Sequence, residues 1–492
     1  MNRMLATRID NRFVKGMLIA LMAFLAISWW PAYRLPLGDS HEGRVLGQFA
    51  LHVANFWNLG FVDSSFGASW EPFSQIPYTH HPPLLTYLHL LISTVAGQGL
   101  AQIKMVSYVA GLTTVPVLYW VGRRLGLGAF AAFISTVALV ATPWWWVYGR
   151  LGLGFLPNLL MIGSIWAVLE EPKIRRLRLA GTASFFAVVA SWHGVFLAPF
   201  LWLWVWRRHR FNRISLRLAL PIILGMLLVM IWVVQGGGVG ELGDHFDQRT
   251  RGNWTWGEFI ERQWRFAREL LPTWYLIVAL PGFIAGLVDI RTRFITTVLA
   301  VMVVLFAVIP DQGAWIHDYW NFPILLVLFP GLAVLADRIG TWVIHWLDNR
   351  FAGRLTGESR IYAKATVVVL LAVSALFVLA PTSRHNRHFA ITAMAGELIT
   401  ETKPALEQTA IWHVPEVPWP TWLAYAWDLP PVALIKASDA SNVPDHDLVI
   451  VRLDRLPNWL SSTASESTVN TKGRYALLKG STLQRHIFEV GQ

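Results

Sequence analysis

Residues 14–34 read VKGMLIALMAFLAISWWPAYR, and the next ten, residues 35–44, read LPLGDSHEGR. The first stretch is long and apolar enough to cross a bilayer, which takes about 20 mostly apolar residues. Four basic residues but a single acid, Asp10, lie at or before its start, so the positive-inside rule predicts a cytoplasmic N-terminus. Its short apolar core also suits a cleaved signal peptide, but the many apolar stretches that follow favour a retained anchor.

The rest of the chain has the same apolar character. Of its 492 residues, 54% are hydrophobic and 14% are charged, and there is no Cys, whereas about 25% of the residues of an ordinary soluble domain are charged. This composition excludes a soluble multidomain enzyme, a disordered chain, a disulfide-stapled domain and a coiled coil. It predicts a polytopic α-helical membrane protein with about 11–13 membrane helices. The further apolar stretches lie near residues 83–122, 126–147, 155–169, 179–206, 218–234, 273–290, 294–310, 321–338 and 362–381.

Two of these stretches have lengths that do not fit one simple crossing. Residues 83–122 look like two helices broken near Gly97–Gly99, and residues 179–206 must cross twice although they number only 28. Short helices around a polar cavity satisfy both conditions, because irregular backbone is tolerated in a membrane only where protein or water surrounds it.

The formal net charge is +11, and its interpretation depends on where in the chain the charged residues lie. In a soluble protein it would indicate nucleic-acid binding, whereas basic residues of membrane proteins gather in cytoplasmic loops. The N-terminus and five clusters hold 22 of the 41 Lys and Arg residues, the clusters being 123–124, 173–178, 207–217, 291–293 and 338–364. The excess therefore indicates topology in the plasma (inner) membrane, and no nucleic-acid partner is expected.

The same assignment divides the chain into two domains. Residues 1–381 form the transmembrane domain, with outer loops at 38–82, 235–272 and 311–320. Residues 382–492 carry 10 basic and 11 acidic residues and are expected to form an extracytoplasmic α/β domain. Its predicted elements are a helix near 390–403 and strands at 409–413, 447–452 and 475–478.

The first outer loop contains the strongest local motif, Leu37 to Arg44. Asp39 and Glu42 are three residues apart, so at a helix start they share one face and offer a carboxylate pair for general-base chemistry. Asp39 could equally cap the helix, with Glu42 at its third position. The helix expected over 42–58 has one apolar, aromatic side, which suits either the membrane interface or packing on the protein.

The same loop ends in His80-His81-Pro82-Pro83, at the predicted start of the second span. The two histidines could donate hydrogen bonds to a phosphate or a sugar hydroxyl. His41, Glu42, His80 and His81 are also residue types that bind zinc, but their spacing is not diagnostic of a metal site. We therefore expect no required cofactor, with a divalent metal as the alternative.

Together these motifs resemble the GT-C glycosyltransferases, in the branch of the protein O-mannosyltransferases and the lipid A aminoarabinose transferase. The resemblance implies that Asp39 is the catalytic acid of the first loop, that Glu42 assists it, and that His81-Pro82-Pro83 opens the second span. It further implies donor-binding roles for Arg150 and for His317 and Tyr319. The acid that often follows such an arginine is absent after Arg150, which leaves more weight on Asp39 and Glu42.

The implied activity is transfer of a sugar from a polyprenyl-phosphate donor to a lipid, glycan or protein acceptor on the outer membrane face. The donor head is anionic, and Arg44 and Arg150 are candidate partners because guanidinium groups bind phosphate with two parallel hydrogen bonds. Five arginines of the loop 235–272 are further candidates: Arg249, Arg251, Arg262, Arg265 and Arg268. For Arg249 and Arg251, a solvated ion-paired loop is the alternative. Trp144-Trp145-Trp146 is expected to form an interfacial aromatic belt. The rival hypothesis is a multi-span lipid or sugar transporter without transfer chemistry.

Overall fold

The computed structural model describes most of the helical part and several segments of the C-terminal part. The described residues are 2–79, 81–149, 174–209, 213–250, 252–318, 320–350, 387–388, 390–402, 410–414, 417, 421–427, 432–433, 439, 442–456, 468–479 and 481.

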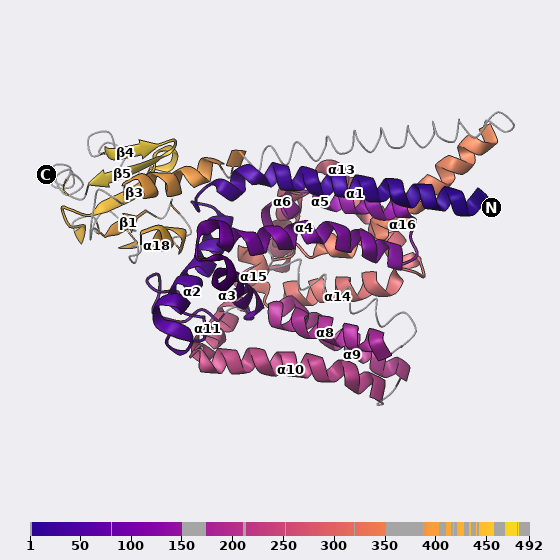
Figure 1. Cartoon of the computed structure of the whole chain (residues 1–492), viewed down its shortest axis with the longest axis horizontal. Coiled ribbons are helices and arrows are strands. Elements are labelled where there is room, and N and C mark those ends of the chain that lie inside the picture. The colour runs from indigo at the N-terminus through magenta and orange to yellow at the C-terminus, as the bar shows by residue number, and fades with distance from the viewer. Residues whose placement is uncertain are drawn as a thin grey trace.

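Long helices make up the larger part of the molecule, and a small sheet lies at one end of it (Figure 1). The N-terminus of α1 lies at the opposite end from that sheet. Among the described residues, the helices up to His209 are α1 (Asn2–Arg34), α2 (His41–Asp63), α3 (Leu84–Ala96), α4 (Leu100–Arg124), α5 (Ala129–Val140), α6 (Pro143–Tyr148), α8 (Ile174–Ala190) and α9 (Trp192–His209). They are followed by α10 (Arg213–Gln235), α11 (Val239–Thr250), α12 (Trp256–Leu270), α13 (Thr273–Val288), α14 (Arg293–Val308), α15 (Asp311–Ile316) and α16 (Ile324–Arg350).

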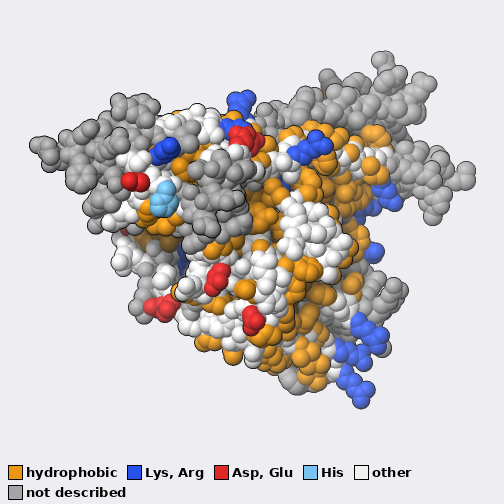
Figure 2. Space-filling model, turned by 60° about the vertical axis from the view of Figure 1, so that its left-hand side comes forward, with side chains coloured by type: hydrophobic (Ala, Val, Ile, Leu, Met, Phe, Trp, Pro, Cys, Tyr) orange, Lys and Arg blue, Asp and Glu red, His pale blue; other side chains and the backbone are white. Residues whose placement is uncertain are grey.

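The membrane character predicted from composition is visible in these helices. Four are long and apolar enough to cross a bilayer over Phe13–Arg34, Leu100–Arg124, Ser215–Gln235 and Ile324–Trp342. Helices α12 and α13 together form a further candidate that bends by 118°, and four shorter apolar helices accompany them. Broad hydrophobic areas cover the face shown in Figure 2. The total of 11–13 membrane helices remains a prediction.

Both predicted helix breaks are present. Helix α3 ends at Ala96 and α4 begins at Leu100, with Gly97 at φ +90° between them, a backbone conformation that favours glycine. Residues 179–206 lie in two short helices, α8 and α9, which meet at Ser191. The first stretch is therefore a short helix followed by a helix long enough to cross a bilayer, and the second is a pair of short helices.

Three predicted cytoplasmic segments meet at one ion-paired cluster. Arg291, just before α14, pairs with Asp289 at 3.0 Å and with Asp337 of α16 at 3.2 Å. Asp337 also accepts a hydrogen bond of 3.2 Å from the amide of Gly128, which precedes α5. The cluster therefore ties the loops after α4 and α13 to α16, and it explains part of the basic character at this end.

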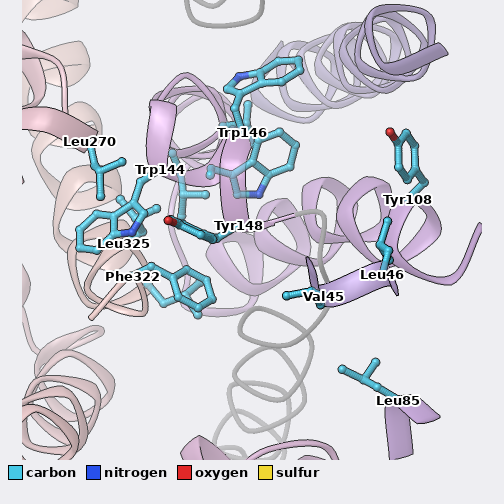
Figure 3. Packing of buried hydrophobic residues seen from close by; sticks show 14 of the residues in the cluster. Val45, Leu46, Leu85, Tyr108, Trp144, Trp146, Tyr148, Leu270, Phe322 and Leu325 are labelled. Atoms are coloured by element: carbon cyan, nitrogen blue, oxygen red, sulfur yellow. The ribbon is translucent and has the colours of Figure 1, made fainter. Parts of the chain in front are cut away.

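The hydrophobic core corrects one sequence prediction. Trp144, Trp145 and Trp146 are at most 3% exposed, so they do not form an aromatic belt at the membrane surface. Trp145 stacks on Trp29 of α1 at 5.2 Å, and Trp146 meets Trp29 edge-on at 5.7 Å. Figure 3 shows Trp144 and Trp146 on the short helix that also carries Tyr148. Trp145 and Trp146 instead pack α6 against α1.

The C-terminal part contains a five-stranded sheet in the order β2-β1-β3-β5-β4. Its strands are β1 (Ile411–His413), β2 (Val432–Ala433), β3 (Leu448–Arg452), β4 (Thr468–Lys472) and β5 (Tyr475–Lys479). Strand β3 pairs in parallel with β1 and in antiparallel with β5. Its residues LVIVR are all buried, as expected for a β-branched central strand. The three predicted strands and the helix over 390–402 are confirmed.

The C-terminal part packs closely against the first outer loop and α2. A Cβ on Gly38 would lie 2.1 Å from the carbonyl oxygen of Thr392, and one on Gly47 would lie 2.6 Å from the amide nitrogen of Trp422 in α18 (Thr421–Trp427). The hydroxyl of Thr421 donates a hydrogen bond of 2.8 Å to the carbonyl of Arg44. Glycine at these two positions is therefore what lets the backbones touch.

Candidate functional site

Asp39 lies in the short segment between α1 and α2, directly before the helix. Its backbone N–H donates to the carbonyl of Thr392 at 3.2 Å, and its residue is 4% exposed. The helix cap is Ser40, whose Oγ accepts a hydrogen bond of 3.0 Å from the amide of Gly43. The alternative that Asp39 caps α2 is therefore wrong by one residue, and the carboxylate is available for other contacts.

Those contacts come from the C-terminal sheet. The hydroxyl of Tyr475, at the start of β5, donates a hydrogen bond of 2.8 Å to Asp39 Oδ2. An amino nitrogen of Arg452, at the end of β3, lies 3.7 Å from the same oxygen. The other oxygen, Oδ1, is buried and has no hydrogen-bond partner among the described residues. Residues 436 positions apart thus meet at one carboxylate.

Burial dominates the charge state of Asp39. It raises the pKa of Asp39 from 3.8 to about 6, against the opposing effects of the Tyr475 hydrogen bond and the Arg452 charge. Burial, followed by the nearby Asp39 charge, raises the pKa of Tyr475, which therefore stays protonated and remains a donor. A carboxylate with a pKa close to neutral is suited to general-base work, because it is ionised at pH 7 yet still binds a proton well.

Glu42 lies in the first turn of α2 and faces a different neighbour. It is 4% exposed, and the hydroxyl of Tyr108 in α4 lies 3.4 Å from its Oε1, at donating distance. Because Ser40 caps the helix, Asp39 lies outside it, and the predicted shared helical face of Asp39 and Glu42 is not formed. The two acids are buried in the same segment, but Asp39 accepts a hydrogen bond from the sheet and Glu42 accepts one from α4.

The end of α6 connects the first outer loop to the last one. The ring of His41 meets the ring of Tyr148 edge-on at 5.1 Å, and the hydroxyl of Tyr148 donates a hydrogen bond of 2.6 Å to Asp318. Tyr148 also lies beside Phe322, ring to ring at 6.4 Å (Figure 3). Burial, with the charge of Arg44, lowers the pKa of His41, so this imidazole is neutral at pH 7.

Helix α15, which leads into the loop before α16, is held in turn by α12. Arg262 donates to the carbonyl of Trp315 at 3.2 Å, and Gln263 donates to that of Ala314 at 2.7 Å. His317 is 9% exposed and stacks near Trp320 at 6.1 Å. The predicted outer loops 235–272 and 311–320 therefore pack together, and Arg262 has a positioning contact in them.

The predicted site residues divide into three groups. Asp39, Glu42, Arg44 and His317 lie in the segments just described. His81 lies elsewhere in the outer region, with its ring 5.7 Å from that of Tyr78, in an aromatic group with Trp70. The remaining three predicted residues, His80, Arg150 and Tyr319, fall outside the described residues.

The alternative of a metal site was assigned to His41, Glu42 and His81. Within the part of the chain that the structure describes, no group of three His, Asp or Glu side chains is arranged to hold a metal ion. The expectation that no cofactor is required remains a prediction.

Sequence reasoning missed three side chains of this site: Tyr475, Arg452 and Tyr108. Tyr475 and Arg452 were recognised as strand ends, and their strands do pair so that the two residues lie opposite each other. A facing Tyr and Arg at the end of a strand pair is a detectable signal for a polar cluster. Nothing in the local sequence connects that cluster to Asp39.

Comparison with known proteins assigns the fold. No protein-family model matches the sequence, and no curated protein matches it. Among solved structures, ArnT from Cupriavidus metallidurans bound to undecaprenyl phosphate matches with a TM-score of 0.59 at 14% identity, over 94% of this chain and 98% of that one. The same protein in the apo state matches with a TM-score of 0.57 at 15% identity, over 95% and 99%.

ArnT is the lipid A aminoarabinose transferase and has the GT-C fold. The match extends over nearly the whole of both chains. The resemblance noted in the sequence is thus confirmed at the level of the fold: the chain is an integral membrane protein of GT-C architecture with a small C-terminal α/β part.

Proposed function

We propose that this chain is a glycosyltransferase that moves a sugar from a polyprenyl-phosphate donor to an envelope acceptor on the outer face of the membrane. The observation that carries the proposal is Asp39: a buried carboxylate with a pKa raised to about 6, held on one oxygen only, between the helical part and the C-terminal sheet. Burying a carboxylate that is only partly hydrogen-bonded reduces the stability of the fold. Carboxylates perturbed in this way are concentrated at functional sites.

In the proposed step, Asp39 accepts the proton of an acceptor hydroxyl or amine. The acceptor oxygen or nitrogen forms a bond to the anomeric carbon, and the bond from that carbon to the phosphate oxygen breaks. The electron pair leaves with the polyprenyl phosphate, and the configuration at the anomeric carbon is inverted. The step requires no cofactor, because the driving force resides in the sugar–phosphate bond of the donor.

Cationic and hydrogen-bonding groups near the outer surface would stabilise the departing phosphate electrostatically. Arg44 and His317 lie in the segments around Asp39, and we assign them this role together with His80, His81, Arg150 and Tyr319. Glu42, held near Tyr108, assists Asp39. Support for a polyprenyl-phosphate donor comes from the matching fold of ArnT, which binds undecaprenyl phosphate.

The proposal is tested with the purified protein in lipid nanodiscs. The probes are undecaprenyl phosphate carrying radiolabelled mannose or radiolabelled aminoarabinose, supplied with an envelope extract as the acceptor source. We expect release of free undecaprenyl phosphate by the wild type and a loss of about 100-fold or more in Asp39→Asn, the range for removal of a general base. Asp63→Asn, an exposed acid at the far end of α2, is the matched control and should retain the wild-type rate.

Near-normal turnover by Asp39→Asn would refute the assignment of the base. In the transporter alternative, the label crosses the bilayer while the sugar–phosphate bond stays intact. Translocation of the intact donor in proteoliposomes, with no free undecaprenyl phosphate formed by either probe, would therefore overturn the proposed function.

A further inference from the structure

The carboxylate of Asp39 is held asymmetrically by the C-terminal sheet. Oδ2 receives the hydroxyl of Tyr475 at 2.8 Å and faces Arg452 at 3.7 Å. Oδ1 is equally buried, yet no hydrogen-bond donor among the described residues reaches it. A buried acceptor without a partner is uncommon and calls for an explanation. Here it leaves one buried oxygen whose capacity to accept a proton or hydrogen bond is not used by any described residue.

The direction of the Tyr475 hydrogen bond is fixed by its other neighbour. Arg474 donates to the Tyr475 hydroxyl oxygen from Nε at 3.1 Å and from an amino nitrogen at 3.0 Å. Those two bonds occupy the acceptor side of the hydroxyl, so its single proton is directed to Asp39. The phenol is fully buried and cannot rotate to solvent, which makes it a rigid donor.

Arg452 is held just as firmly. Its side chain is 8% exposed and pairs with Asp454 at 2.9 Å, while its backbone lies opposite Tyr475 in the β3–β5 pairing. Two adjacent strands therefore present a donor and a positive charge to the same oxygen of Asp39. Interfaces between domains usually resemble transient protein–protein interfaces, whereas here two paired strands hold both contacting side chains in place.

We infer that Tyr475 and Arg452 are positioning residues, through which the C-terminal part orients the base of the transmembrane part. They hold Oδ2, so that Oδ1 receives the proton from the acceptor as the acceptor attacks the anomeric carbon and the polyprenyl phosphate departs. This inference rests on the proposed function. It assigns the C-terminal sheet a role in the reaction, beyond any contact with the acceptor.

The role has a measurable consequence for pH dependence. A hydrogen bond to the ionised carboxylate favours the charged form, so its loss must raise the pKa of Asp39 further. The base then becomes protonated at a higher pH, and the acidic limb of kcat/KM moves upward. The titratable or charged groups that act on Asp39 are Tyr475 on β5, Arg474 in the turn before it, Arg452 on β3 and Asp454 in η4 (Leu453–Arg455). On its own segment, Asp39 is followed by His41, Glu42 and Arg44 in the first turn of α2.

Tyr475→Phe is the direct test, because it removes the hydroxyl and keeps the buried ring. In the nanodisc assay we expect kcat to fall and the donor KM to stay within about twofold. The acidic limb should move up by about one to two pH units, since a hydrogen bond to a charged group contributes about 1.5–3 kcal/mol. Arg452→Gln should move the limb in the same direction and serves if Tyr475→Phe does not fold.

Lys472→Gln is the matched control. Lys472 lies opposite Tyr475 in the β4–β5 pairing and pairs with Glu397 and Glu401 on the helix over 390–402, so it stabilises the same domain. Its loss should leave the pH limb in place. A limb that is unchanged in both Tyr475→Phe and Arg452→Gln would overturn the inference, even if both variants lose activity.

A readout without turnover separates this inference from the proposed function. The infrared band of the protonated Asp39 carboxyl, identified by its absence in Asp39→Asn, should titrate at a higher pH in Tyr475→Phe than in the wild type. An unchanged titration midpoint refutes the positioning role. If instead the midpoint moves but Asp39→Asn transfers sugar normally, the assignment of Asp39 as the base fails and the inferred contact to Asp39 stands without its catalytic meaning. If the midpoint moves and the wild type releases no undecaprenyl phosphate, the proposed function itself fails.

Discussion

Asp39→Asn should make the protein more stable at neutral pH while it removes the proposed base. The ionised carboxylate is buried, with one oxygen unpartnered among the described residues, and burial raises its pKa to about 6. The amide of Asn has nearly the same shape, carries no charge, and its oxygen can still accept the hydrogen bond from Tyr475. The substitution therefore removes an unfavourable buried charge without creating a cavity.

The magnitude follows from the shift. The pKa of Asp39 lies about two units above the value of about 3.9 in an unfolded chain, and each unit corresponds to about 1.36 kcal/mol. Because the folded state binds the proton more tightly, the contribution of Asp39 to stability is full below about pH 4 and is lost as pH rises through about 6. We expect Asp39→Asn to exceed the wild type by up to about 3 kcal/mol at pH 7.5.

The measurement is the free energy of unfolding in mixed detergent micelles, followed by tryptophan fluorescence between pH 4.5 and 8. The excess stability of Asp39→Asn should shrink steadily toward the acidic end. Asp454→Asn is the control with the opposite sign: the hydrogen bond from Arg452 lowers the pKa of Asp454, so this variant should be less stable than the wild type at pH 7.5. If Asp39→Asn is the less stable protein at pH 7.5, or if its difference does not depend on pH, the reasoning is wrong.

Two further predictions concern the contacts around the site. Gly47→Ala places a methyl group 2.6 Å from the amide nitrogen of Trp422. We expect this variant to be destabilised by about 1–3 kcal/mol and to be cleaved faster by proteases within the C-terminal part. The control Gly240→Ala, which has open space around it, should match the wild type. Tyr148→Phe removes the 2.6 Å hydrogen bond to Asp318 and should raise the donor KM about tenfold; an unchanged KM in initial-rate measurements would contradict a donor-site role for this loop.

The membrane part was predictable because its signals are local. Apolar length, glycine at the break after Ala96, and basic clusters can each be recognised within about 20 residues, and the helices α3, α4, α8 and α9 follow them. The strands at 411–413, 448–452 and 475–479 were also recognisable from their β-branched and aromatic residues. Strands β2 and β4 were not predicted, because β2 has only two residues and β4 is a polar strand at the edge of the sheet.

The failures have physical reasons of their own. Asp39 and Ser40 are both good helix caps, so the sequence cannot say which of two neighbours caps α2. A run of tryptophans has the same composition whether it faces lipid headgroups or packs on Trp29, and burial alone distinguishes the two. Tyr475 and Arg452 reach Asp39 only through the tertiary fold, which no spacing or motif near either end reports.

The bond between Asp39 and Tyr475 spans 436 positions of the chain, and this separation orders events during biogenesis. Asp39 emerges with the first helix, but its partner is synthesised only after every described helix has been made. Until then, Asp39 lacks the hydrogen bond from Tyr475 and is not yet buried by the C-terminal part. Under the proposed function, the base is therefore oriented only in one of the last steps of maturation, and an incompletely translated or misdocked chain would not transfer sugar from the donor lipid.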